Sequence, residues 1–200
     1  MDALQHLHYC ARQADPPGGL IRPTPAAQSP ITINLSPVSL GRRDLAQELS
    51  RILEKHRFSA SRLAIEITET ALIELPQGAV HALNSLERLG MRIVLDDFGT
   101  GYSSITRLGR LPFNTLKIDL SLIGVPPARD ARRILKAMIE LAQALGLRVV
   151  AERVEDDDTW EEMARLGCDQ IQGFGLSPPL PADEVQDWLQ HPSRSVAGHA

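Results

Sequence analysis

The sequence predicts an α/β fold in which parallel strands alternate with helices. Three observations support this prediction: six short apolar runs recur along the chain, helical patterns separate them, and glycines follow several of the helical patterns. The strand runs are apolar rather than alternating, which is typical of strands covered on both faces. These observations leave two architectures open, a barrel and an open, doubly wound sheet.

The expected strands are short and rich in aliphatic and β-branched residues. Residues 31–35 read Ile-Thr-Ile-Asn-Leu, and residues 63–68 read Leu-Ala-Ile-Glu-Ile-Thr. Both runs have the usual length and composition of strands. Four more strands are expected at residues 92–95, 115–118, 148–151 and around 169–172.

The expected helices show apolar residues on one face. The first helix, at residues 43–56, has such positions at i, i+4, i+7 and i+8, namely Leu45, Leu49, Ile52 and Leu53. Gly90, Gly146 and Gly167 each stand just past a helical pattern, where a left-handed residue commonly ends a helix. Residues 156–158 are all Asp, which predicts a helix N-terminus there. The other helices are expected at residues 77–89, 103–108, 128–145, 159–166 and 182–189.

Composition excludes several classes of protein. The 200 residues are 43% hydrophobic and 23% charged, which excludes a disordered chain. The net charge of −4 offers no basic excess for a nucleic-acid duplex, so DNA is not an expected partner. The sequence has no secretion signal and no apolar stretch of roughly 18 residues, so we expect a cytoplasmic protein without a membrane span.

We expect three segments along the chain. Residues 1–30 are interpreted as the end of a helix and a proline-rich loop, residues 31–190 as the folded domain, and residues 191–200 as a flexible tail. The two cysteines, Cys10 and Cys168, have no CxxC neighbour and are expected to be free thiols.

Polar side chains stand at the C-terminal ends of the expected strands, where parallel α/β folds build their active sites. They are Asn34, Glu66, Glu69, Asp96, Asp97, Lys117, Asp119, Glu152, Glu155 and Gln172. So many carboxylates at one edge would repel one another, and bound Mg²⁺ or Mn²⁺ would relieve that repulsion. The alternative, that they are scattered caps and surface charges, does not account for an ordered set on successive strands.

Lys117 lies inside an otherwise apolar run, so it needs an anionic partner in the fold. Asp119, two residues later, points to the same face of the strand. Carboxylates, an amide and a lysine around metal ions suit the hydrolysis of a phosphate ester.

Six segments resemble, in order and spacing, the motifs of the EAL family of cyclic di-GMP phosphodiesterases. The pair DDFGTGYSS and LKID is the most specific, and the resemblance covers residues 31–189. It implies a TIM-like (β/α) barrel, a requirement for Mg²⁺ or Mn²⁺, and hydrolysis of cyclic di-GMP to linear pGpG. The six segments are ITINLSP, AIEITET, VLDDFGTGYSSITRL, FNTLKIDLSLI, VVAERVED and IQGFGLSPPLP.

The resemblance also implies roles for individual residues. Glu152 is the expected general base, and Lys117 is expected to orient the attacking water. Glu69 is expected to hold the DDFGTG loop, Gln172 to lie near metals and substrate, and Glu155 to give a supporting contact. The expected metal ligands, with Asp97 serving a second ion, are Asn34, Glu66, Asp96, Asp97 and Asp119.

The sequence departs from the family pattern in two places. The strand that carries Glu-Ala-Leu, whose Glu is a metal ligand, does not occur in the 200 residues, so we expect an incomplete barrel of about six strands without the first two. Arg153 stands where the family usually has Gly, and its cation could clash with a substrate phosphate or attract it.

Three functions remain open at this point. The chain is an EAL-type phosphodiesterase domain, or an inactive relative that binds cyclic di-GMP or a protein, or a metal-dependent aldolase or sugar-phosphate enzyme. The aldolase would need a phosphate-binding loop, for which Gly173 and Gly175 are weak candidates. A homodimer, or fusion to sensory or GGDEF domains as in relatives, is also expected.

Overall fold

The computed structural model describes residues 30–76, 78–99, 108–121, 128–181 and 184–190. The expected N-terminal helix and most of the proline-rich loop, the tail at 191–200, and all but the last residue of the helix expected at 103–108 lie outside these ranges. No described helix is long and apolar enough to cross a bilayer.

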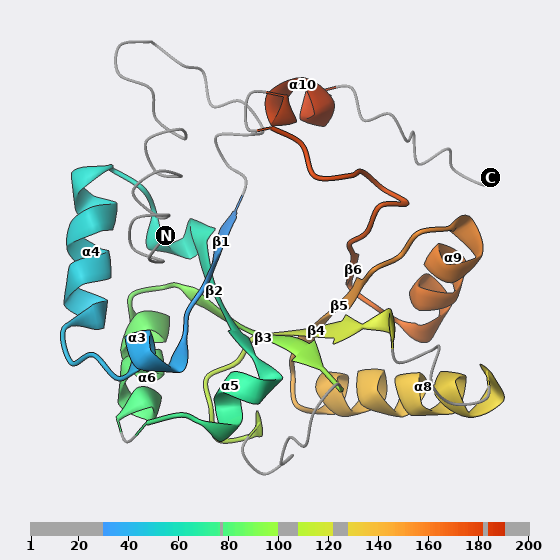
Figure 1. Cartoon of the computed structure of the whole chain (residues 1–200), viewed down its shortest axis with the longest axis horizontal. Coiled ribbons are helices and arrows are strands. Elements are labelled where there is room, and N and C mark those ends of the chain that lie inside the picture. Colours follow the sequence, from blue (N-terminus) through green and yellow to red (C-terminus); the bar gives the residue numbers. More distant parts are fainter. Residues whose placement is uncertain (1–29, 77, 100–107, 122–127, 182–183, 191–200) are drawn as a thin grey trace.

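The described strands form one sheet in which every neighbouring pair is parallel. They follow one another in space in the order of the sequence, without the reversal that defines a doubly wound sheet. The sheet is therefore a curled half-barrel (Figure 1), and all six expected strands are present. The strands are β1 (Ile31–Asn34), β2 (Leu63–Thr68), β3 (Arg92–Phe98), β4 (Thr115–Asp119), β5 (Arg148–Glu152) and β6 (Gln170–Ile171).

Most of the described helices cover the convex side of this sheet, whereas α10 (Val185–Gln190) lies across from its open, concave side (Figure 1). The larger helices are α4 (Leu45–Lys55), α6 (Ala79–Arg88), α8 (Ala128–Ala144) and α9 (Asp157–Leu166). The smaller ones are α3 (Pro37–Leu40), α5 (Glu69–Ile73), α10 (Val185–Gln190) and a 3-10 turn (Ala60–Arg62).

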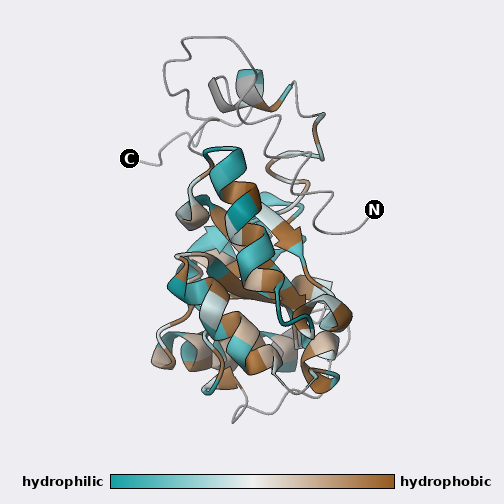
Figure 2. Cartoon of the chain, turned by 90° about the vertical axis from the view of Figure 1, so that its left-hand side faces the viewer, coloured by the Kyte–Doolittle hydropathy of each residue, from teal (hydrophilic) through white to brown (hydrophobic). Residues whose placement is uncertain are grey.

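Alternation along the strands separates the core from the site. In β4 the side chains of Leu116 and Ile118 are fully buried, whereas Lys117 and Asp119 lie on the opposite face. The helices complete the core from outside: α4 buries the predicted stripe of Leu45, Leu49, Ile52 and Leu53. Figure 2, seen from the α4 side, shows hydrophobic colour concentrated in the strands behind this helix. The apolar face of the sheet thus packs against the helices, and the opposite face carries the charged side chains.

Three helices end in the same way before the next strand. Gly90, Gly146 and Gly167 have φ angles of 92°, 73° and 91°, which confirms the predicted left-handed ends of α6, α8 and α9. After α8, Gly146 N–H donates to the carbonyl of Gln143 and Leu147 N–H to that of Ala142, both at 2.9 Å. This is the Schellman pattern, in which the following apolar residue turns back to the core.

Two short helices were not predicted. The side chain of Ser36 accepts from Ser39 N–H at the start of α3, and that of Thr68 accepts from Ala71 N–H at the start of α5, both at 3.3 Å. Four or five residues are too few to show a helical period, so only these caps signal the helices in the sequence.

Candidate active site

The register of the sheet brings the polar strand ends to one edge. Asn34 is paired with Glu66, and Asp119 is paired with Glu152. On β3, Asp96 is paired with the last residue of β2, Thr68. Residues paired in adjacent strands point to the same face, so the predicted site residues of β1 to β5 gather along one rim.

Lys117 joins three of these strand ends. Its Nζ lies 3.0 Å from Glu66 Oε1, 3.2 Å from Asp96 Oδ1 and 2.7 Å from Glu152 Oε1. The residue is only 7% exposed, and the three protons of an ammonium match three carboxylate partners. The lysine therefore has the anionic partners that its apolar sequence context predicts.

Burial and mutual repulsion alter the proton affinities of this group. Burial raises the pKa values of Glu66 and Glu152, and the ammonium of Lys117 opposes that rise. Burial alone would lower the pKa of Lys117, but the bonds and charges of Glu152 and Glu66 outweigh it, so its pKa lies above the ordinary value. One ammonium among these carboxylates leaves an excess of negative charge that a cation would neutralise.

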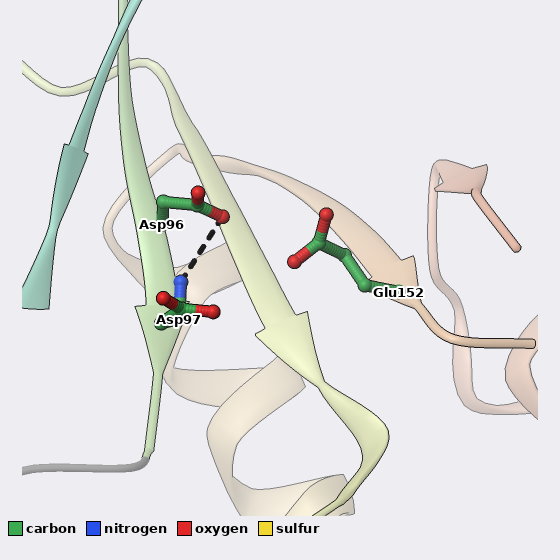
Figure 3. Close-up of side chains that lie close together, drawn as sticks. All are labelled: Asp96, Asp97 and Glu152. Carbon is green, nitrogen blue, oxygen red and sulfur yellow. Dashed lines mark hydrogen bonds between the residues drawn. The ribbon is translucent and has the colours of Figure 1, made fainter. Parts of the chain in front are cut away.

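Asp96, Asp97 and Glu152 form the tightest group of acids among the described residues. One oxygen of each lies within 4.8 Å of the others. Figure 3 shows the carboxylates of Asp96 and Glu152 turned toward each other, with Asp97 beside Asp96. Carboxylate oxygens at this spacing suit a hard divalent cation such as Mg²⁺ or Mn²⁺ after a small adjustment.

The backbone of β3 explains how two consecutive residues share this group. In a regular strand, Asp96 and Asp97 would point to opposite faces. Here the pairing with β4 shifts register between Leu95 and Phe98, and Asp97 has a φ of 55°. Aspartate tolerates this left-handed conformation better than most residues, and the bulge brings both carboxylates to one side. Asp97 N–H also donates to Asp96 Oδ1 at 3.1 Å.

Glu69 connects the site to α5. It is 1% exposed, and its Oε2 accepts a hydrogen bond of 2.8 Å from the backbone N–H of Gly99, directly after β3. Gly99 begins the GTG part of the motif, so the bond joins Glu69 to the segment that it is predicted to hold, and that role stays a prediction.

Asp119 has two partners. Its Oδ1 accepts from Ser121 N–H at 2.7 Å, and its Oδ2 lies 3.1 Å from Arg153 Nε. Sequence reasoning noted the charge of Arg153 but missed this ion pair. The register of β4 and β5 explains the pair. Asp119 lies beside Glu152, and Arg153 follows Glu152 in the chain.

Three predicted site residues lie apart from the tight group of acids. Asn34 is exposed at the end of β1, and Glu155 is exposed after β5. Gln172 is also exposed, and its backbone N–H and C=O bond to Ala151 and Val154. The roles of these residues, like those of the other predicted ligands, stay predictions.

Comparison with known proteins decides the family. The model of the EAL domain matches residues 19–179 of this chain. The chain belongs to the EAL domain family. The match includes every strand of the half-barrel and every predicted site residue.

Relatives of this EAL domain include named enzymes of Pseudomonas aeruginosa. The bifunctional diguanylate cyclase/cyclic di-GMP phosphodiesterase MucR is 36% identical over 156 residues, which are 78% of this chain and 23% of MucR. The cyclic di-GMP phosphodiesterase RocR is 34% identical over 159 residues, 79% of this chain and 41% of RocR. This EAL domain thus spans less than half the length of either relative.

Solved structures agree with the fold. The PaMucR phosphodiesterase in complex with c-di-GMP superimposes with a TM-score of 0.78 at 34% identity, covering 91% of this chain and 72% of that one. The manganese/cyclic di-GMP complex of Klebsiella pneumoniae BlrP1 has a TM-score of 0.76 at 28% identity, covering 88% and 44%. The predicted TIM-like barrel of EAL type is confirmed, as a half-barrel of six strands within the described residues.

Proposed function

We propose that this EAL domain is a metal-dependent phosphodiesterase that hydrolyses cyclic di-GMP to linear pGpG. The observation that carries the proposal is the contact of Lys117 with Glu66, Asp96 and Glu152, beside the tight group of Asp96, Asp97 and Glu152. Buried carboxylates in excess of their one ammonium favour a bound divalent cation.

Asp96 and Asp97 would hold such a cation, with Glu66, Asn34 and Asp119 as the further predicted ligands, and the carboxylate of Glu152 lies beside them. When bound, Mg²⁺ or Mn²⁺ neutralises charge on the phosphoryl group and lowers the pKa of water. This donor set consists of oxygen atoms, which suits those hard ions rather than soft ones.

Glu152 is the proposed general base. Burial raises its pKa above the ordinary value, although Lys117 opposes the rise, and a higher pKa makes the carboxylate a better proton acceptor. Lys117 Nζ holds Oε1 at 2.7 Å, so the second oxygen remains to accept the proton of the attacking water. The oxygen of the attacking water bonds to phosphorus as Glu152 accepts the water's proton. One ester P–O bond breaks, and the departing ester oxygen takes up a proton to become a hydroxyl group.

The proposal extends to partners and location. The partner is cyclic di-GMP, the ligand with which PaMucR and BlrP1 were solved. A homodimer, attachment to sensory or GGDEF domains, and a cytoplasmic site of action belong to the same proposal. MucR, by its name, combines diguanylate cyclase and phosphodiesterase activities in one chain.

A second candidate function is an EAL domain that binds cyclic di-GMP without cleaving it. The observation that favours it is Asp119, a predicted metal ligand whose two oxygens are both engaged by Ser121 and Arg153. If that engagement persists, the second metal lacks a ligand while the nucleotide can still bind.

One experiment separates the two functions. The chain is incubated with Mn²⁺ and cyclic di-GMP, and pGpG is measured by chromatography. We expect turnover that Glu152→Gln lowers by about 100-fold or more, because a general base contributes on the order of 10²–10⁴. The matched control is Glu161→Gln on the exposed face of α9, which should leave the rate unchanged. Binding of cyclic di-GMP without any pGpG would rule out the enzyme and favour the receptor.

A further inference from the structure

Arg153 combines an unfavourable backbone with an ordered side chain. It follows β5 directly and has a φ of 61°, a left-handed conformation that a long side chain rarely adopts. Such a conformation costs free energy and persists only where surrounding contacts compensate for it. Its Nε lies 3.1 Å from Asp119 Oδ2. This ion pair holds the side chain, and the bonds of Val154 to Gln172 and Gly175 hold the adjacent backbone.

Asp119 is well suited to hold a guanidinium in place. Its side chain is 4% exposed, whereas that of Arg153 is 65% exposed. The other carboxylate oxygen is fixed by Ser121 N–H at 2.7 Å. Asp119 therefore acts as a rigid acceptor, and it is absent from the tight group formed by Asp96, Asp97 and Glu152.

The guanidinium has donors to spare. Its contact with Asp119 is made through Nε, a guanidinium carries five N–H donors in all, and the side chain is 65% exposed. Arg153 also follows Glu152 directly in the chain, and its anchor Asp119 is paired with Glu152 in the register of the sheet. A cation with free donors thus stands next to the acids that suit a metal ion.

A phosphodiester at this rim needs such a cation. The ammonium of Lys117 is already paired with three carboxylates, those of Glu66, Asp96 and Glu152. Asp97 and Asp119 add two more negative charges nearby. Arg153 adds a positive charge at this rim that these carboxylates do not enclose, since its side chain is 65% exposed. Guanidinium groups bind phosphate oxygens with two parallel hydrogen bonds, which a point charge does not provide.

We propose that Arg153 is a phosphate-binding residue of this site, positioned by Asp119, and that it binds a phosphodiester group of the cyclic dinucleotide beside the cation-binding acids. The inference rests on the proposed function, because it assumes a cyclic dinucleotide at this rim. It assigns Asp119 the task of anchoring Arg153 in place of the predicted task of binding a metal ion.

The test measures nucleotide and metal binding separately. Binding of cyclic di-GMP is followed by calorimetry in Ca²⁺, the ion of a BlrP1 complex with this nucleotide, and binding of Mn²⁺ alone by electron paramagnetic resonance. Arg153→Gln should weaken nucleotide binding by about 10- to 100-fold, as expected for one charge-assisted contact, and leave Mn²⁺ affinity within about twofold. Arg148→Gln, the same change at the exposed opposite end of β5, is the matched control and should alter neither.

Asp119→Asn tests the anchor. It should weaken nucleotide binding as Arg153→Gln does and leave Mn²⁺ affinity within about twofold, whereas loss of a metal ligand would weaken Mn²⁺ binding. The double variant should lose little more nucleotide affinity, because both changes remove one contact. Circular dichroism checks that each variant is folded, and Arg153→Lys, which keeps the charge but not the fork, should restore only part of the affinity.

Three results would overturn the inference. Equal nucleotide affinity in Arg153→Gln and the wild type would refute it and leave the proposed function intact. Tighter Mn²⁺ binding with unchanged nucleotide affinity would assign Arg153 to blocking the metal site instead. Failure of the wild-type chain to bind cyclic di-GMP at all would remove both the inference and the proposed function.

Discussion

At the scale of single residues, the site depends on two left-handed backbone positions that flank it. Asp97 and Arg153 have φ angles of 55° and 61°. The first lets consecutive carboxylates face the same side, and the second directs a guanidinium to the buried Asp119. Both conformations are strained for residues with a side chain, which is typical of functional sites. The strain is located where the proposed chemistry occurs.

The thiol of Cys168 lies outside the site, and its burial and neighbouring charge predict its reactivity. Burial, and then the charge of Asp169, raises the pKa of Cys168 to about 11. Compared with an ordinary thiol of pKa 9.0, the thiolate fraction at pH 8 falls by about 100-fold, and the rate of reaction with Ellman's reagent should fall with it. Cys10→Ser isolates this thiol, and the same variant in denaturant supplies the reference rate.

The sign of the pH effect follows from the same shift. The folded state holds the Cys168 proton more tightly than the unfolded state, so this group stabilises the fold fully below pH 9.0 and loses that contribution as the pH rises toward 11. Equal reaction rates in folded and denatured protein at pH 8 would contradict the raised pKa.

At the scale of elements, sequence periodicity predicted the elements whose apolar pattern repeats and did not predict the shortest helices. The stripe of α4 and the apolar runs of all six strands recur over enough residues to be read directly. α3 and α5 do not, and β3 continues to Phe98, beyond the predicted end at residue 95. That extension carries Asp96 and Asp97, so their position on a bulged strand end could not be derived from pattern alone.

A substitution at the C-terminal end of α8 tests the role of its left-handed glycine. At Gly146 the φ is 73°, and an added Cβ would meet no heavy atom of a neighbouring segment within 4 Å. Gly146→Ala should therefore lower the free energy of unfolding by about 1 kcal/mol through backbone strain alone. Gly146→Asn is the matched control and should cost less, because Asn tolerates the left-handed region. Urea unfolding measures both, and equal losses would point to a cause other than the dihedral angle.

At the scale of the whole molecule, strand order explains why separate motifs form one site. Each strand pairs with its neighbours in the sequence, so successive strand ends lie side by side along the rim. The sequence predicted these ends and the anionic partners of Lys117, because both follow from local pattern and burial. The pairing of Arg153 with Asp119 depends on the register between β4 and β5, which no single segment encodes.

That convergence couples metal binding to the stability of the entire half-barrel. The predicted ligands Asn34, Glu66, Asp96 and Asp97 come from three strands, so a cation that they bind stabilises the folded chain and has no matching site in the unfolded one. At about 100 times its dissociation constant, Mn²⁺ should add about 2.7 kcal/mol, which corresponds to a rise in Tm of roughly 5–10 °C for a chain of this size. Differential scanning calorimetry measures the rise, and EDTA should reverse it.

Two variants decide where that stabilisation originates. Asp96→Asn should abolish the Mn²⁺-dependent rise in Tm, because it removes one oxygen donor of the group formed with Asp97 and Glu152. Asp158→Asn, in the exposed acidic run at the start of α9, is the matched control and should keep the full rise. The opposite pattern would place the cation at the α9 N-terminus, and the rim of carboxylates would then lack the ion that the proposed hydrolysis requires.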